Sequence, residues 1–554
     1  MTPTRELRNF RRRDVLRVAL STAAIAPFAK LFGADAPIPV PTKVVRTTNG
    51  RVQGFAHDGL QVFKGMPYGA PPIGDLRFLP PEKPKPWRGV ADATEFGPPA
   101  IQMAGGAIAS PATDFGRQMT SIFPVPQEIK IENEDCLFLN VWTPAVDTGK
   151  KRPVMVWLHG GGFAYGSGAW PVYDGANLAR KGDAVIVSVN HRLNVFGYLY
   201  LGAVSDRYAQ SGNAGMLDIV AALEWVRDNI EAFGGDPTNV TIFGESGGGL
   251  KVCALMAMPA AKGLFHKAIV ESGPGLRGIS KENAAQLARG VLAELQISAG
   301  DLKALACVSP QGLVEAAAAA MAKVGGGGMG SSTRLAPVED AVVLPADPYT
   351  PAAPAISADV PLIVGTNKDE MTLFVIAEPW FMRLTEAELP ARAKAIAGDK
   401  SEALIAAIRK AHPDYSPAYV LASVMTDQTM LGGSIKLAER KIARRGAPVY
   451  MYCLVWETPV LNGLFKSPHT LELPLVFDIV DKARVLVGPG PNPETISRQM
   501  SDAWLAFAHT GNPNASSIPA WPAYSVEKRA TMLFDVESRV ADDPQREVRL
   551  ALEG

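Results

Sequence analysis

A serine enclosed by glycines is the first residue whose type and setting could do chemistry. The stretch "VTIFGESGGGLKV", residues 240–252, is a strand-like run that turns at "GESGG" into a helix-like run. A phosphate-binding loop would need a lysine where Leu250 stands, and Lys251 comes one position late. A G-x-S-x-G turn between a strand and a helix is typical of a nucleophile elbow. We therefore predict that Ser246 is a nucleophile.

A serine hydroxyl needs a base to take its proton, and in this strand-and-helix arrangement the base follows the serine in the chain. Four histidines lie downstream: His266, His412, His469 and His509. The sequence favours a surface helix for the first, an exposed helix end for the second and a helix C-terminus for the last. His469, in "FKSPHTLELPLVF", comes shortly after the strand-like run "VYMYCLVW". We predict that His469 is the base.

Two acidic residues could orient that base. The run "VPLIVGTNKDEMTLF" places Asp369 and Glu370 just past the end of a predicted strand. Loop carboxylates are common, so the residues by themselves leave both open.

A second glycine loop follows another strand, in "PVMVWLHGGGF". Glycines at such a strand end can direct bare N–H groups at one point, which is how an oxyanion hole is made. We predict that the N–H groups of Gly161, Gly162 and Gly247 form one.

The elements that must position these residues alternate along the chain. Short β-rich runs, such as "AVIVSV", "KAIVE" and "VPLIVG", alternate with helix-like runs, such as "DIVAALEWVRDNI". This alternation predicts an α/β fold with a mainly parallel sheet and helices on both faces. The segment "EAAAAAMAKVGGGGMGSS" predicts a helix followed by a loop. We predict one domain over residues 37–554, with helical insertions.

Composition narrows the class of protein. Of the 554 residues, 47% are hydrophobic and 20% charged, with 55 basic and 55 acidic residues, so no net charge points to nucleic acid or an anionic membrane surface. No apolar run after the N-terminus reaches the length of a membrane span. The four cysteines form no CxxC pair, which argues against a metal site, and we expect buried thiols: Cys136, Cys253, Cys307 and Cys453. No cofactor is implied.

The N-terminus has the composition of an export signal. "RNFRRRDVLRVALSTAAIAPFAKLFGADA" has a basic start, an apolar stretch and small residues at the end. Its pair Arg12-Arg13 resembles a twin-arginine signal. We predict that residues 1–36 are a leader and that the protein is exported, to the periplasm or the medium.

Several motifs together resemble those of type-B carboxylesterases, members of the α/β-hydrolase superfamily. They are "FKGMPYGAPPIGDLRF", "EDCLFLNVWTP", "HGGGF", "GNAGMLDIVAALEWVRDNIEAFGGDPTNVTIFGES", "GTNKDE", "HTLELPLVF" and "AWLAFAHTGNPN", spread over nearly the whole predicted domain. The resemblance implies the α/β-hydrolase fold. It also implies a nucleophile, an acid and a base at Ser246, Glu370 and His469, with an oxyanion hole from Gly161, Gly162 and Gly247. The resemblance adds one assignment that the residues alone left open, because it implies that Glu370 rather than Asp369 is the acid.

The chain departs from that family's pattern in three places. Gly247 stands where the family usually has alanine, and no cysteine precedes Cys136 to pair with it. The loop over residues 102–130 contains no Trp or Tyr, so it lacks the tryptophan face against which the resemblance implies that cholinesterases hold their cationic substrate.

These patterns predict a serine esterase acting on a small-molecule ester through an acyl-enzyme. The same machinery would also serve an amide, carbonate or lactone hydrolase. A non-catalytic binding protein that has kept the fold is a further alternative, although the chain has every predicted catalytic part. Small and apolar residues in the 103–129 loop favour an uncharged acyl or alcohol group. Glu245 fits either a pocket wall or a structural role.

Overall fold

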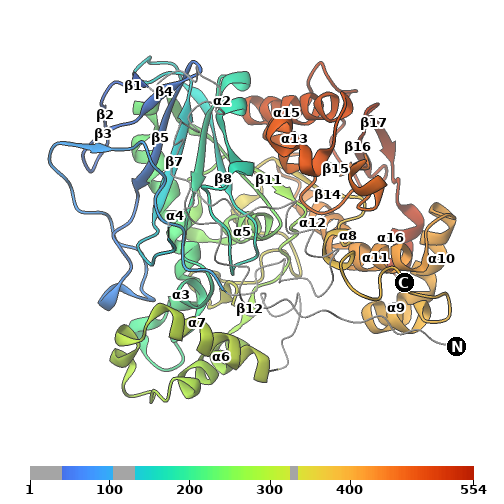
Figure 1. Cartoon of the computed structure of the whole chain (residues 1–554), viewed down its shortest axis with the longest axis horizontal. Coiled ribbons are helices and arrows are strands. Elements are labelled where there is room, and N and C mark those ends of the chain that lie inside the picture. Colours follow the sequence, from blue (N-terminus) through green and yellow to red (C-terminus); the bar gives the residue numbers. More distant parts are fainter. Residues whose placement is uncertain (1–39, 104–130, 325–334, 554) are drawn as a thin grey trace, which may run out of the picture. The chain divides into compact units, whose positions relative to one another are not determined.

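Twelve strands form the central sheet of the computed structural model, which describes residues 40–103, 131–324 and 335–553 (Figure 1). Seven neighbouring strands run parallel, and the strands at either side of them pair antiparallel. In spatial order the twelve are β1 (Val40–Pro41), β4 (Phe55–His57), β5 (Leu60–Pro67), β7 (Phe138–Thr143), β9 (Val185–Val189), β8 (Arg152–Leu158), β10 (Gly235–Glu245), β11 (Lys267–Glu271), β14 (Leu362–Asn367), β15 (Val449–Leu454), β16 (Ala530–Phe534) and β17 (Arg539–Asp542). The parallel part runs from β9 to β16, so the predicted mainly parallel sheet is confirmed.

Side chains of the central strands alternate between two cores, one on each face of the sheet. In β8, Val154, Val156 and Leu158 enter the larger core, while Met155 and Trp157 enter the smaller one. Both faces are therefore apolar, which explains the continuous hydrophobic runs in the sequence. Helices α4 (Ala214–Asn229), α5 (Gly247–Ala257) and α12 (Gly432–Ile442) line the larger core, and α2 (Ala176–Gly182), α13 (Leu473–Val476) and α15 (Asn492–Thr510) line the smaller.

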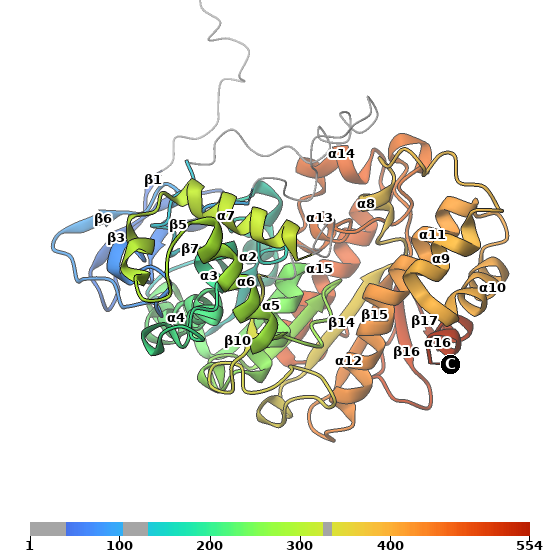
Figure 2. The same ribbon diagram turned by 90° about the horizontal axis from the view of Figure 1, so that it is seen from below.

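The remaining helices are additions around this frame. Helices α6 (Lys281–Glu294) and α7 (Pro310–Lys323) pack together, and α7 is the helix predicted in the alanine-rich segment. A second group lies beyond β15 and β16 in Figure 2: α9 (Leu389–Ala397), α10 (Ser401–Ala411), α11 (Pro417–Thr426) and α16 (Arg546–Glu553). Besides 3-10 turns and one π-helical turn, the described chain has further short elements. They are α3 (Asn194–Tyr198), α8 (Thr372–Val375), α14 (Arg484–Val487), a sheet of β2 (Val45–Arg46), β3 (Arg51–Gln53) and β6 (Val90–Asp92), and a pair of β12 (Ile279–Ser280) and β13 (Val338–Glu339). A mainly parallel sheet with helices on both faces is the predicted α/β architecture.

Two expectations from the sequence were wrong. Cys307 is exposed, whereas the other three cysteines are buried free thiols. His266 is not on a helix: it lies directly before β11, and its Nδ1 accepts the N–H of Val240 at 3.1 Å. The hydrophobic residues around "LFHKAIV" belong to the start of a strand rather than to a helix face.

The chain from Val40 onward forms one compact unit. The predicted leader over residues 1–36 and most of the 102–130 loop lie outside the described residues. Within the described ranges, no helix is long and apolar enough to cross a membrane, and no group of His, Cys, Asp and Glu side chains could hold a metal ion.

Candidate active site

The sheet brings the predicted site residues to one edge. Strands β8, β10, β11, β14 and β15 are neighbours in this order and run parallel. The glycine loop follows β8, Ser246 follows β10, Glu370 follows β14 and His469 follows β15. All four therefore leave the sheet at its carboxyl edge, which is where open parallel sheets hold ligands.

Ser246 occupies a strained turn between β10 and α5. Its backbone has φ 55° and ψ −119°, a conformation that is rare for a residue with a side chain. The turn is held from both sides, because the N–H of Ser246 donates to Glu271 O at 2.8 Å and its carbonyl accepts the N–H of Leu250 at 3.1 Å. A Cβ on Gly248 would overlap the carbonyl of Leu158, so only glycine fits there. Such over-determined strain is typical of functional turns.

His469 and Glu370 form a buried pair. Glu370 Oε2 lies 2.5 Å from His469 Nδ1, and the backbone N–H of His469 donates to Glu370 O at 3.2 Å. The second carboxylate oxygen, Oε1, accepts the N–H of Asn367 at 2.7 Å. A carboxylate on Nδ1 favours the tautomer with the proton on that nitrogen, which leaves Nε2 free to accept one.

The other imidazole nitrogen faces the serine turn. His469 Nε2 lies 3.0 Å from Oε1 of Glu245, the residue directly before Ser246. This is an ion-pair distance, but the two groups are not aligned for a hydrogen bond. Burial lowers the pKa of His469, but the Glu245 and Glu370 carboxylates outweigh burial and raise it overall. Burial in turn raises the pKa of Glu245, which His469 opposes. The two groups therefore compete for one proton.

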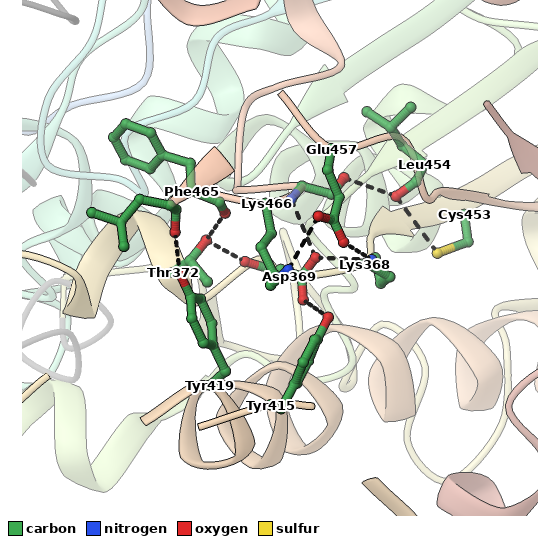
Figure 3. Close-up of polar contacts among 12 residues, drawn as sticks. Lys368, Asp369, Thr372, Tyr415, Tyr419, Cys453, Leu454, Glu457, Phe465 and Lys466 are labelled. Atoms are coloured by element: carbon green, nitrogen blue, oxygen red, sulfur yellow. Dashed lines mark hydrogen bonds and ion pairs between the residues drawn. The ribbon is translucent and has the colours of Figure 1, made fainter. Parts of the chain in front are cut away.

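Asp369, the other acid that the sequence left open, belongs to a different network (Figure 3). Its Oδ1 accepts the Tyr415 hydroxyl at 2.9 Å, and its Oδ2 accepts the N–H of Ser467 at 3.2 Å. Lys368 lies 3.6 Å from the same carboxylate. These contacts direct Asp369 toward Tyr415 and Ser467 and leave Glu370 as the carboxylate on the imidazole.

The glycine loop after β8 lies beside the turn. Gly161 and Gly162 have φ values of 84° and 60°, which favour glycine. A Cβ on Gly160 would lie 3.6 Å from the Cβ of Ser246 and 2.9 Å from Glu245 Oε2. A Cβ on Gly247 would overlap the backbone of Gly162. The three predicted donors, on Gly161, Gly162 and Gly247, thus come from two touching backbone segments.

The remaining downstream histidines make contacts of their own. His509 lies in the last turn of α15, and its Nε2 lies 2.8 Å from Gly182 O. His412 follows α10 and stacks on Tyr415 at 4.3 Å between ring centroids. Neither contact involves the serine turn.

Sequence reasoning missed three buried polar residues around the His469–Glu370 pair and the glycine loop. Asn367 donates its N–H to Glu370, and its side chain donates to Pro468 O at 2.8 Å and to Glu472. Glu472 also accepts the Ser272 hydroxyl at 3.2 Å. Lys251 lies beneath the glycine loop. The available signal was position: Asn367 ends a strand, Glu472 follows the histidine by three residues, and Lys251 stands in an otherwise apolar helix.

Chemically, the arrangement can transfer an acyl group. It offers a hydroxyl on a strained turn, an imidazole whose tautomer is fixed by a carboxylate, and glycine N–H groups next to the turn. None of these groups requires a metal ion or an organic cofactor.

Comparisons with known proteins point to one family. The model of the "Carboxylesterase family" matches residues 41–551. The chain is 37% identical to para-nitrobenzyl esterase of Bacillus subtilis, covering 92% of this chain and 98% of that protein. It is 33% identical to human cocaine esterase, covering 94% and 92%. The crystal structure of Geobacillus stearothermophilus carboxylesterase EST55 at pH 6.2 is similar, with a TM-score of 0.78, 39% identity and coverage of 92% of this chain and 100% of that one.

Proposed function

Because the chain belongs to the carboxylesterase family, has the α/β-hydrolase fold and is a carboxylic ester hydrolase, we propose that it cleaves esters through an acyl-enzyme formed on Ser246. His469 is the general base, Glu370 orients it, and the N–H groups of Gly161, Gly162 and Gly247 form the oxyanion hole. One observation carries this proposal: His469 Nδ1 lies 2.5 Å from Glu370 Oε2 in a buried contact. This pair lies at the same carboxyl edge of the sheet as the Ser246 turn.

In the first half of the reaction, Ser246 Oγ attacks the ester carbonyl carbon while His469 Nε2 takes the hydroxyl proton. The carbonyl oxygen becomes an oxyanion that the glycine N–H groups stabilise. His469 then gives its proton to the leaving alcohol as the C–O bond breaks. In the second half, water attacks the acyl carbon while His469 Nε2 takes its proton. The bond between the acyl carbon and Ser246 Oγ then breaks, His469 returns the proton to Oγ, and the carboxylic acid leaves.

The substrate we propose is a carboxylic ester with an uncharged acyl or alcohol group. Two relatives, para-nitrobenzyl esterase and cocaine esterase, are named for esters. A cleft for an amide, carbonate or lactone would use the same acyl-transfer groups, so the assay below includes an anilide.

The test is hydrolysis of p-nitrophenyl acetate, butyrate and octanoate, with p-nitroacetanilide in parallel, by the parent enzyme and by Ser246→Ala. We expect saturable ester hydrolysis that falls by roughly 10⁴ to 10⁶ in the variant, because the nucleophile is lost. Preference along the three chain lengths sizes the acyl site. Ester hydrolysis that survives in folded Ser246→Ala would refute the proposed nucleophile, and faster turnover of the anilide would identify an amidase.

We further propose that the enzyme is exported through a twin-arginine leader. The support is the Arg12-Arg13 pair, which precedes an apolar stretch and the small residues around Ala36.

A further inference from the structure

Lys251 is a buried cation in an unfavourable place. It lies in the second turn of α5, four residues after Gly247, and its side chain is fully buried. A helical side chain extends toward the helix N-terminus, so this ammonium lies near the positive end of the helix dipole. Burial lowers the pKa of Lys251 to about 7, against the opposing effect of Glu245. Both burial and the dipole work against the charge, and specific contacts must offset them.

Those contacts are with the proposed oxyanion loop. Lys251 Nζ donates to His159 O at 2.9 Å and to Gly162 O at 2.8 Å. These two carbonyls lie at the two ends of the HGGG segment, so a single ammonium holds both ends at once. The Phe163 ring, whose centroid lies 5.3 Å from Nζ, covers the same cation. A loop of glycines has little stiffness of its own, and this clamp supplies it.

The clamp reaches the third proposed donor through packing. Gly247 touches the backbone of Gly162 so closely that a Cβ there would overlap it. The Gly162 carbonyl that Lys251 holds is among the atoms that such a Cβ would meet. Lys251, Gly162 and Gly247 therefore form one packed unit, and displacement of the first would move the other two.

Lys251 also supplies positive charge on the oxyanion side. His159, the first residue of the HGGG segment, stacks on His191 with 4.8 Å between ring centroids, and burial together with Lys251 lowers the pKa of each imidazole. Both imidazoles are therefore neutral at pH 7, and the carboxylate that acts on Lys251 is Glu245. Because its pKa is lowered to about 7, Lys251 carries part of a positive charge near neutral pH, and that charge lies behind the glycine N–H groups in a poorly screened interior.

We propose that Lys251 is a positioning residue for ester hydrolysis: it clamps the HGGG loop through His159 O and Gly162 O, aligns the Gly161, Gly162 and Gly247 N–H groups, and places a positive charge behind the oxyanion. This inference rests on the proposed function, because it presupposes that those N–H groups bind the oxyanion.

The test compares Lys251→Met with Lys441→Met. Lys441 is also a fully buried helical lysine bound to a carbonyl, that of Ala358 at 2.6 Å, so it controls for loss of a buried ammonium away from the site. We expect Lys251→Met to lower kcat for p-nitrophenyl butyrate about 10- to 100-fold, somewhat less than loss of a direct oxyanion donor, with KM changed less than about threefold. The Lys441→Met variant should keep the parent kcat.

A second readout isolates the oxyanion. An alkyl trifluoromethyl ketone accepts Ser246 Oγ at its carbonyl carbon, and the proton passes to His469, so the adduct carries an oxyanion but no leaving group. Its inhibition constant should rise in Lys251→Met by about the same factor as kcat falls, which a general loss of packing would not produce. Lys251→Gln, which keeps an N–H donor without the charge, is measured in parallel and should fall between the parent and Lys251→Met.

The outcomes separate the two proposals. If the parent is active, Ser246→Ala is inactive and the folded Lys251 variants match the parent in kcat and in ketone affinity, the positioning role is refuted while the acyl-enzyme mechanism stands. If Lys251→Met does not fold, Lys251→Gln decides alone: a parent-like ketone affinity refutes the role, and a weakened one supports it. Activity that survives in Ser246→Ala would instead overturn the proposed function itself.

Discussion

Replacing Glu245 by glutamine should shift the acidic limb of the pH profile to lower pH. The Glu245 carboxylate lies 3.0 Å from His469 Nε2, and the two side chains are 2% and 3% exposed. A negative charge at this distance favours the imidazolium, so its removal lowers the pKa of His469. Activity is lost on acidification when the base becomes protonated. A lower pKa therefore extends activity to lower pH.

The size of the shift follows from the distance. Two unit charges 3.0 Å apart interact by about 1.4 kcal/mol at the dielectric constant of water and by about 5.5 kcal/mol at an effective value near 20. At about 1.36 kcal/mol per pH unit, these limits correspond to about 1 and about 4 units. Because burial raises the pKa of Glu245 itself, that carboxylate carries only part of its charge near neutral pH. We expect a shift near the lower limit, of about 1 to 2 units.

The assay is kcat/KM for p-nitrophenyl butyrate across the acidic and neutral range, since this ratio reports ionisations of the free enzyme. Asp369→Asn is the matched control, because Asp369 is also a buried carboxylate next to Glu370 but binds Tyr415 and Ser467 instead of the imidazole. Its acidic limb should not move. A limb that stays in place in Glu245→Gln would refute the reasoning, because it would mean that Glu245 is already protonated and gives His469 no charge.

Three further outcomes are expected. Glu370→Gln should lower kcat for p-nitrophenyl butyrate by about 10³ to 10⁴, because the wrong imidazole tautomer is then favoured. The kcat of Asp369→Asn should stay within about tenfold of the parent value, and comparable losses in the two variants would contradict the choice of Glu370 as the acid. Although the family usually has alanine at this position, Gly247→Ala should lower kcat about tenfold or more in this chain, because the methyl group would overlap the Gly162 backbone that Lys251 holds. The loss should be smaller in a Lys251→Met background, where the loop can yield. Replacement of Arg12-Arg13 by two lysines should retain the enzyme in the cytoplasm, as measured by cell fractionation. Unchanged export of this variant would contradict a twin-arginine route.

Most of the frame could be predicted because its signals are local. The hydrophobic runs of β8, β9 and β10 are buried on both faces, and each is bounded by glycine or polar residues, so the existence of each strand and its place along the chain follow from the sequence. Ser246 stood out for the same reason, since the glycines around it are required by a turn of fixed geometry.

The contacts across the site could not be predicted, because they join segments far apart in the chain. Whether Asp369 or Glu370 meets the histidine depends on which way each side chain leaves the loop after β14, and the partners that decide it, Tyr415 and Ser467, come 46 and 98 residues after Asp369. His266 was misplaced because a short apolar run does not distinguish a helix from the start of a strand.

Lys251 shows a different limit of sequence reasoning. In the sequence, its position one residue late served only to reject a phosphate loop. A lysine in an apolar helix is usually interpreted as a solvated or snorkelling side chain. The buried position becomes meaningful only once the HGGG carbonyls, about 90 residues earlier, are known to lie against it.

Negative side chains lie on the imidazole side of the site and a positive one lies on the side of the glycine loop. Each has the sign opposite to the charge that the proposed reaction creates beside it. Next to the imidazole lie the buried carboxylates of Glu245 and Glu370, with Glu472 close behind, and all three raise the pKa of His469. Behind the glycine loop lies the Lys251 ammonium. Proton transfer from Ser246 creates an imidazolium on the first side and an oxyanion on the second. Fixed charges of opposite sign at both places would lower the energy of that charge-separated state more than that of the neutral ester complex, which is the condition for raising kcat rather than only tightening binding.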